Sequence, residues 1–203
     1  MLRETFFVLT KPFCSEEKQT ELWSEIEKSH SKKGRFYHDL SHLEHLLKTL
    51  SEIKSKISDW ETTLFCLFYH DIVYKATGKT NEENSADLAA KRLSEIKYPI
   101  EKIEQCHAMI LATKAHNFCS DSDINLFTDA DLSILGSDWE TYFTYAKNVR
   151  KEYKIYPDFM YNPGRKKVLQ HFLGMPRMFK TDWFFERFEE QARSNLKRES
   201  DLL

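Results

Sequence analysis

Histidine and aspartate side chains that could bind a metal are concentrated in a few places in this 203-residue chain. His38, His42 and His45 follow one another at i, i+4 and i+7, a spacing that places them on one stripe of a continuous helix. His70 and Asp71 end the most apolar stretch of the chain. Two adjacent polar side chains are costly to bury there unless they are paired or coordinated.

A further pair of acids, Asp129 and Asp131, lies in the apolar segment 126–135. A carboxylate in such surroundings needs a cation or a hydrogen-bond donor. Imidazole nitrogens and carboxylate oxygens from separate elements are ligands that a hard or borderline divalent metal accepts without any thiolate. The residues therefore predict a His/Asp metal site. The alternative is that His70 and Asp71 form a buried hydrogen-bonded pair and that the histidine stripe is a solvated face.

Helices must position these side chains, because five Gly and five Pro are too few for an all-β protein with a turn every ten residues. Ser15, Asp39 and Asp59 precede segments with helical apolar spacing and are expected N-caps. Asn162-Pro163 is expected to start a short helix, and Asp182 the last one. We expect an all-α fold in which residues 1–203 form a single compact multi-helix domain of eight or nine helices.

Composition excludes several classes of protein. The 30 Lys+Arg residues balance 32 Asp+Glu residues, which argues against binding of a nucleic-acid polymer but leaves room for a small anion in a local basic pocket. No apolar run approaches the ~20 residues of a membrane span, and the apolar patch at 6–9 is too short for a signal sequence. The four cysteines form no C-x-x-C pair and do not predict disulfides. We expect a cytoplasmic protein with no membrane partner.

The order His…His-Asp…Asp in an all-helical chain resembles the HD-domain superfamily of metal-dependent phosphohydrolases. More narrowly, five blocks look like those of the subfamily identified as predicted metal-dependent HD phosphohydrolases. They are RFYHDLSHL (35–43), YHDIVY (69–74), NEENSA (81–86), ILATKAH (110–116) and DADLSILG (129–136). The resemblance implies a motif-bearing HD-like core at about 35–153, with C-terminal helices at 162–201 packed on it.

The resemblance also implies a set of ligands for a divalent metal ion, which could be Mn, Mg, Fe, Co, Ni or Zn: His42, His70, Asp71 and Asp131. HD proteins tend to place the first ligand before a hydrophobic-x-x-hydrophobic run, which favours His42 over His38. The family's last ligand typically stands as Ala-Asp before a leucine, which favours Asp131 over Asp129. Asp129 would then support the site or stabilise its helix.

For such a site the resemblance implies hydrolysis of a small phosphate ester, with a nucleotide as one candidate substrate. Asp71 and Glu82 are the expected catalytic residues, because an acid soon after the His-Asp pair could position or deprotonate a water. Glu83 fits a capping box with Thr80 and is given a structural role. Cationic or imidazole groups are expected near the phosphate: His38, Lys114, His116 and Arg150.

Several alternatives stay open. His38 could replace His42 as a ligand, Lys114 could be a solvated helix end, and His116 could join a second metal ion. The protein could be a non-hydrolytic HD protein that senses a nucleotide or a metal, or a di-iron oxygenase, or a purely structural helical protein. His30 and His107 show no partner pattern and are expected to be surface or satisfied core groups. The aromatic block at 183–188 leaves a homo-oligomer open.

Overall fold

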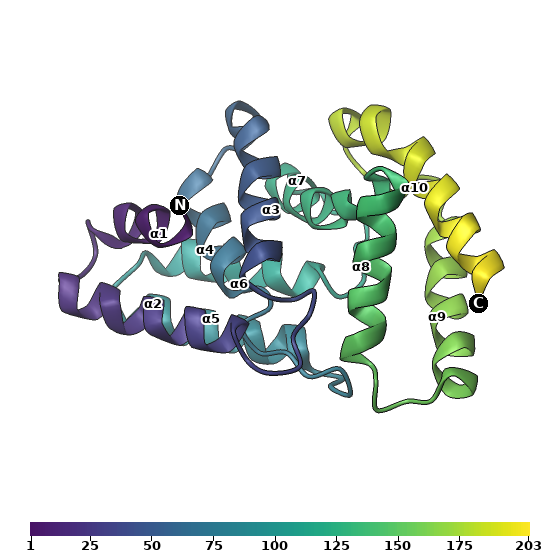
Figure 1. Ribbon diagram of the computed structural model, residues 1–203. Coiled ribbons are helices and arrows are strands. Elements are labelled where there is room, and N and C mark those ends of the chain that lie inside the picture. Colours follow the sequence, from purple (N-terminus) through teal and green to yellow (C-terminus); the bar gives the residue numbers. More distant parts are fainter. The chain divides into compact units, whose positions relative to one another are not determined.

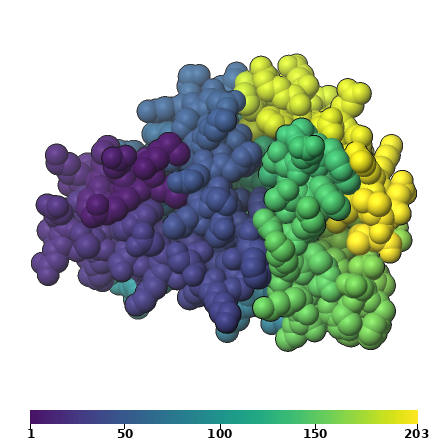
Figure 2. Space-filling model, viewed as in Figure 1, coloured from purple at the N-terminus to yellow at the C-terminus, as the bar shows by residue number.

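The computed structural model describes residues 1–203 and is all-helical, which confirms the predicted fold class (Figure 1). Its ten α-helices fall into two compact units, residues 1–128 and 129–203. Figure 2 shows the surface of the chain from the same side. The single domain over residues 1–203 stays a prediction. No helix combines the length and the apolar character that crossing a bilayer requires.

The first unit is built around α4 (Trp60–Tyr69), whose residues from Thr62 to Tyr69 are all buried, as the apolar sequence predicts. Helices α3, α5 and α6 pack on α4, and α5 also packs on α6. The remaining elements of this unit are α1 (Leu2–Thr10), α2 (Glu16–His30), α3 (Leu40–Glu52), the 3-10 turn η1 (Lys54–Lys56), α5 (Asn81–Glu95), α6 (Ile100–Ala112) and most of α7 (Ser122–Leu132).

Three of the predicted N-caps are confirmed. The Ser15 hydroxyl accepts a hydrogen bond from the Lys18 amide at 3.4 Å, and the Asp59 carboxylate accepts one from Thr62 at 3.1 Å. Asp39 accepts from the amide of Ser41 at 2.8 Å at the start of α3. These caps satisfy amides that have no partner inside their own helix. The starts of α2, α3 and α4 are therefore fixed by local sequence.

Helix α1 was not expected, and with ten helices the estimate of eight or nine is wrong. It has nine residues and no side-chain cap, so it lacks the usual sequence signals. Its stability comes from burial of Leu2, Phe6 and Leu9 on one face. The Phe6 ring meets the ring of Phe68 in α4 edge-on, with 5.1 Å between centroids. Tertiary packing thus makes a helix of a segment that is marginal alone.

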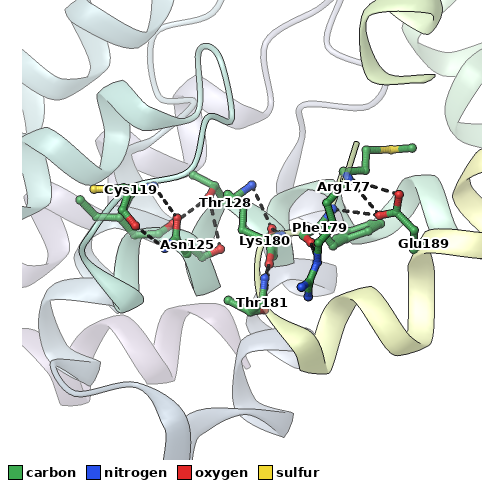
Figure 3. Close-up of polar contacts among 11 residues, drawn as sticks. Cys119, Asn125, Thr128, Arg177, Phe179, Lys180, Thr181 and Glu189 are labelled. Atoms are coloured by element: carbon green, nitrogen blue, oxygen red, sulfur yellow. Dashed lines mark hydrogen bonds and ion pairs between the residues drawn. The ribbon is translucent and has the colours of Figure 1, made fainter. Parts of the chain in front are cut away.

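Helix α7 is fastened to the rest of the first unit at its beginning. The Asn125 side chain accepts from the amide of Cys119 at 2.9 Å and donates to its carbonyl at 2.6 Å (Figure 3). The Asp123 carboxylate accepts from the amides of Ser58 and Asp59 at 2.9 and 2.7 Å. One buried acid of α7 therefore holds the chain where α4 begins.

The second unit contains the 3-10 turn η2 (Ser133–Gly136), α8 (Trp139–Glu152), α9 (Asp158–Gly174) and α10 (Asp182–Leu202). The predicted helix start at Asn162-Pro163 is wrong, because α9 begins at Asp158 and contains Pro163. Proline lacks the amide proton and costs one intrahelical bond there, and the helix tolerates this near its first turns. Gly136 lets α10 approach η2, since an added Cβ would lie 2.6 Å from the Cβ of Phe188.

Buried acids organise the interior of the second unit. Glu199 accepts two hydrogen bonds from Arg165, at 2.8 and 2.9 Å, and a third from the Tyr142 hydroxyl. Asp129 accepts from the amides of Lys180 and Thr181 at 2.9 and 2.7 Å, and from the Lys180 ammonium at 2.9 Å. Asp129 therefore holds the segment that leads into α10, and its expected support of the metal site stays a prediction.

Candidate metal centre

His70 directly follows the last residue of α4, as its C-cap, and is 1% exposed. Its Nδ1 atom lies 3.0 Å from the carbonyl oxygen of Leu67, which can only accept a hydrogen bond. The contact therefore favours the tautomer with the proton on Nδ1 and a lone pair on Nε2. A backbone carbonyl behind the imidazole is a common way to orient a metal-binding histidine.

His42 meets His70 from α3. It is 3% exposed, and its Nε2 atom lies 3.1 Å from Nε2 of His70. Asp131 contributes a third donor: one ligand atom from each of His42, His70 and Asp131 lies within 4.8 Å of the other two. Asp131 stands in the last turn of α7, one turn after Phe127, whose ring lies edge-on to that of His70 at 5.6 Å.

Asp71 adds a carboxylate directly after His70. Its Oδ2 atom lies 3.2 Å from Nε2 of His70 and 3.6 Å from Nε2 of His42. Burial alone would raise the pKa of Asp71, yet the rings of His70, His38 and His42 hold this pKa well below its usual range. Asp71 is therefore an anion at neutral pH and supplies negative charge next to both imidazoles.

The donor set fits a single divalent cation. Ligand atoms that each lie about 2.1 Å from one ion are about 3 to 4 Å from one another, and the His42–His70 separation falls in this range. The set contains nitrogen and oxygen and no sulfur, which suits the borderline and hard divalent metals. The cluster of His42, His70 and Asp131 could hold a metal ion, and its donors do not select one metal. Asp71 lies beside this group without being one of its three donors, so its predicted role as a ligand stays a prediction.

Arg35 is a supporting residue to which sequence reasoning gave no role. Its guanidinium donates to three backbone carbonyls, of His38 at 2.9 Å, Asp71 at 2.7 Å and Ile72 at 2.9 Å. The first precedes α3 and the other two follow α4. One side chain therefore joins the segments on which His42 and His70 stand. The sequence showed only an arginine at the start of the first motif block.

His38 lies beside the cluster without belonging to it. Its ring stacks on Tyr74 with 4.1 Å between centroids and lies 6.0 Å from the ring of His42. The group of donors able to share one ion contains His42 and not His38. This arrangement agrees with the preference for His42 and leaves His38 as a candidate for contact with a substrate.

The predicted capping box at the start of α5 does not form. Thr80 makes no capping hydrogen bond, and its hydroxyl instead accepts from the Asn84 side chain at 3.0 Å. Glu83 is structural in a different way, because it pairs with Lys114, which also donates to the Lys79 carbonyl at 3.0 Å. Lys114 is thus engaged at the protein surface. Glu82 is half-buried in the first turn of α5.

The other two expected phosphate-binding residues have clear local roles. Arg150, in the second unit, donates to Asp158 at 2.6 Å and to the carbonyls of Tyr153 and Tyr156 at 3.0 and 2.9 Å, so it fastens the connection between α8 and α9. His116, in the first unit, follows α6 with a left-handed backbone, at φ 52°, and its amide donates to Ala112 at 3.0 Å. Their contact with a phosphate stays a prediction.

Comparison with known proteins identified no relative of this chain. No protein-family model matches the chain, and neither a curated protein nor a solved structure does. The cluster of His42, His70 and Asp131, with the Asp71 carboxylate beside it, is therefore the basis for a functional proposal.

Proposed function

We propose that this protein is a metal-dependent phosphohydrolase that acts on a small phosphate ester, with nucleotides among the candidate substrates. The observation that carries the proposal is the convergence of donor atoms from His42, His70 and Asp131, with the Asp71 carboxylate beside them. The HD-type order of these residues along the chain supports the same reaction class.

Each protein group has a definable task in this reaction. His70 presents the Nε2 lone pair because Leu67 holds its other nitrogen, and His42 faces it at 3.1 Å. Asp71 and Asp131 supply the negative charge that balances a divalent cation. A divalent metal bound here would lower the pKa of a coordinated water towards about 7 and neutralise phosphoryl oxygens.

Glu82 is our candidate for accepting a proton from the attacking water. Its neighbour Glu83 pairs with Lys114, whereas Glu82 is not part of this ion pair. His38 and Tyr74, stacked beside His42, offer ring surfaces and polar atoms for the substrate. In this proposal the cluster and Glu82 perform the chemistry, while His38 contributes to binding.

Elemental analysis and a phosphate-release screen test the proposal. The full chain would be purified, analysed for metals, and assayed on nucleotides and phosphomonoesters with Mn, Mg, Fe, Co, Ni or Zn added. The variants His70→Ala and Asp71→Ala would be compared with His107→Ala, which removes a surface imidazole paired with Asp87 at 3.1 Å. We expect metal content and phosphate release in the wild type and in the control, with both lost from the two site variants.

The outcomes separate the alternatives. Folded His70→Ala and Asp71→Ala proteins that keep full metal content or wild-type phosphate release would refute the assignment. Stoichiometric iron with visible absorbance and no phosphate release would instead identify a di-iron oxygenase. A protein that purifies without metal and whose stability is unaffected by chelator would be a structural helical protein.

A further inference from the structure

A polar cleft opens in the first unit between the end of α2 and the start of α3. Its volume is about 330 Å³, which is enough for a small metabolite. The polar residues that line it are His30, Ser31, Lys32, Arg35, Asp39 and Ser41. Neither the predicted metal ligands nor Glu82 are among them.

His30 lines this cleft and has an unsatisfied hydrogen-bond acceptor. It is 1% exposed, and its Nδ1 atom lies 2.9 Å from the carbonyl oxygen of Ile26, so this nitrogen carries the proton. The other ring nitrogen, Nε2, is buried without a hydrogen-bond partner. Burial lowers the pKa of His30 to about 3, so the ring is neutral and Nε2 keeps its lone pair. A buried acceptor of this kind calls for a ligand that donates a hydrogen bond.

The mouth of the cleft is positively charged. Lys32 is exposed there and forms no ion pair, and the Arg35 guanidinium keeps its charge while its Nη1 and Nη2 groups bind backbone carbonyls. The start of α3 adds the positive end of a helix dipole. Asp39 is the one acid, and its Oδ1 atom is occupied by the amide and hydroxyl of Ser41 at 2.8 and 2.6 Å. Two cations therefore face one partly satisfied carboxylate, which favours an anion.

We propose that this cleft binds a hydroxyl-bearing organic phosphate, whose hydroxyl donates to Nε2 of His30 and whose phosphate faces Lys32 and Arg35. A neutral polyol would satisfy His30 but leave the cations without a counter-charge. An inorganic anion would satisfy the cations but leave Nε2 without a donor. The ligand class therefore follows from two features of the cleft, the acceptor nitrogen of His30 and the cations Lys32 and Arg35. The inference needs no metal and no hydrolysis, so it goes beyond the proposed function.

Binding of ribose 5-phosphate to the full chain, treated with chelator, tests this inference. Calorimetry would compare ribose 5-phosphate with ribose and with inorganic phosphate, and a long-range ¹H–¹⁵N spectrum would follow the His30 imidazole. His30→Leu identifies the His30 signal by its loss. We expect ribose 5-phosphate to bind at least about tenfold more tightly than either fragment, as one additional hydrogen bond or ion contact provides. The Nε2 resonance should shift on binding.

The two neighbouring lysines provide a matched pair of variants. Lys32→Gln removes a charge that lines the cleft and should weaken binding by about five- to tenfold, the range expected for one charge contact. Lys33→Gln removes a neighbouring exposed lysine that does not line it and should leave binding unchanged.

The inference is overturned by any of four results: no binding without metal, an unmoved His30 Nε2 signal, inorganic phosphate that binds as tightly as ribose 5-phosphate, or equal losses in the two lysine variants. Circular dichroism would check that each variant is folded. Because no assay here measures metal content or phosphate release, failure of the cleft is distinct from failure of the proposed function.

Discussion

Arg35→Lys tests whether the metal centre depends on the backbone carbonyls that Arg35 joins. Arginine donates to the carbonyls of His38, Asp71 and Ile72, whereas the ammonium of lysine keeps the charge but reaches about one of these positions. Two hydrogen bonds from a charged donor are then lost, at about 1.5 kcal/mol each for a partly exposed side chain. The free energy of unfolding should fall by about 3 kcal/mol, which lowers Tm by about 6 to 12 °C for a chain of this size.

Metal affinity should fall as well, because the segments that carry His42 and His70 are no longer joined. Loss of a supporting contact of this kind typically weakens metal binding by about 10- to 100-fold. Calorimetric titration of the metal-free protein with Mn or Zn, well below Tm, would measure the loss. Leu93→Ala is the matched control: it truncates a buried side chain in α5 and should cost about 2 to 5 kcal/mol of stability while keeping metal affinity. An Arg35→Lys protein that is destabilised but binds metal like the wild type would refute the reasoning.

Two further predictions concern buried titratable groups. Glu199→Gln leaves the Arg165 guanidinium buried without its carboxylate and should reduce the free energy of unfolding by about 3 to 5 kcal/mol in denaturant titrations. The exposed Glu190→Gln in the same helix should change it little, and equal effects would contradict the role of the buried pair. The pKa of His30 is 6.5 in the unfolded chain and about 3 in the folded chain. Between pH 6.5 and pH 3, His30 is therefore protonated in the unfolded chain and neutral in the folded chain. Stability should therefore fall by about 1.4 kcal/mol per pH unit, or about 2 kcal/mol at pH 5, and level off below pH 3. His30→Leu should remove this part of the acid sensitivity, and an unchanged pH profile would count against a neutral buried His30.

Local sequence was sufficient to predict where a helix begins when a side chain at its end caps it. Ser15, Asp39 and Asp59 cap helices with atoms only two or three residues away, so their positions could be predicted. Helix α1 has no such cap and forms because Phe6 reaches α4, which is information from another part of the chain. The start of α9 was misplaced because proline is common in the first turn of a helix, whereas Pro163 lies deeper within α9.

In the candidate site, too, some features could be predicted from the sequence and others could not. The types and order of His42, His70 and Asp131 predicted a cluster that the structure brings together. Neither the Leu67 carbonyl behind His70 nor the three carbonyls bound by Arg35 could be predicted, because every residue type has a carbonyl and only the fold selects one. The unsatisfied nitrogen of His30 is equally a property of burial. A histidine without a sequence partner looked like an ordinary surface or core group.

Helix α7 carries two acids, Asp129 and Asp131, that contact different parts of the chain. This constrains how the length of the helix can vary. Successive residues of an α-helix are rotated by about 100°, so Asp129 and Asp131 project about 200° apart, towards nearly opposite sides. Asp129 accepts hydrogen bonds from the two residues before α10, and the Asp131 carboxylate lies close to His42 and His70. Deleting a single residue upstream within α7 would turn both acids away from their partners at once. Insertions and deletions should therefore be tolerated in the surface loops of this protein long before they are tolerated in this helix.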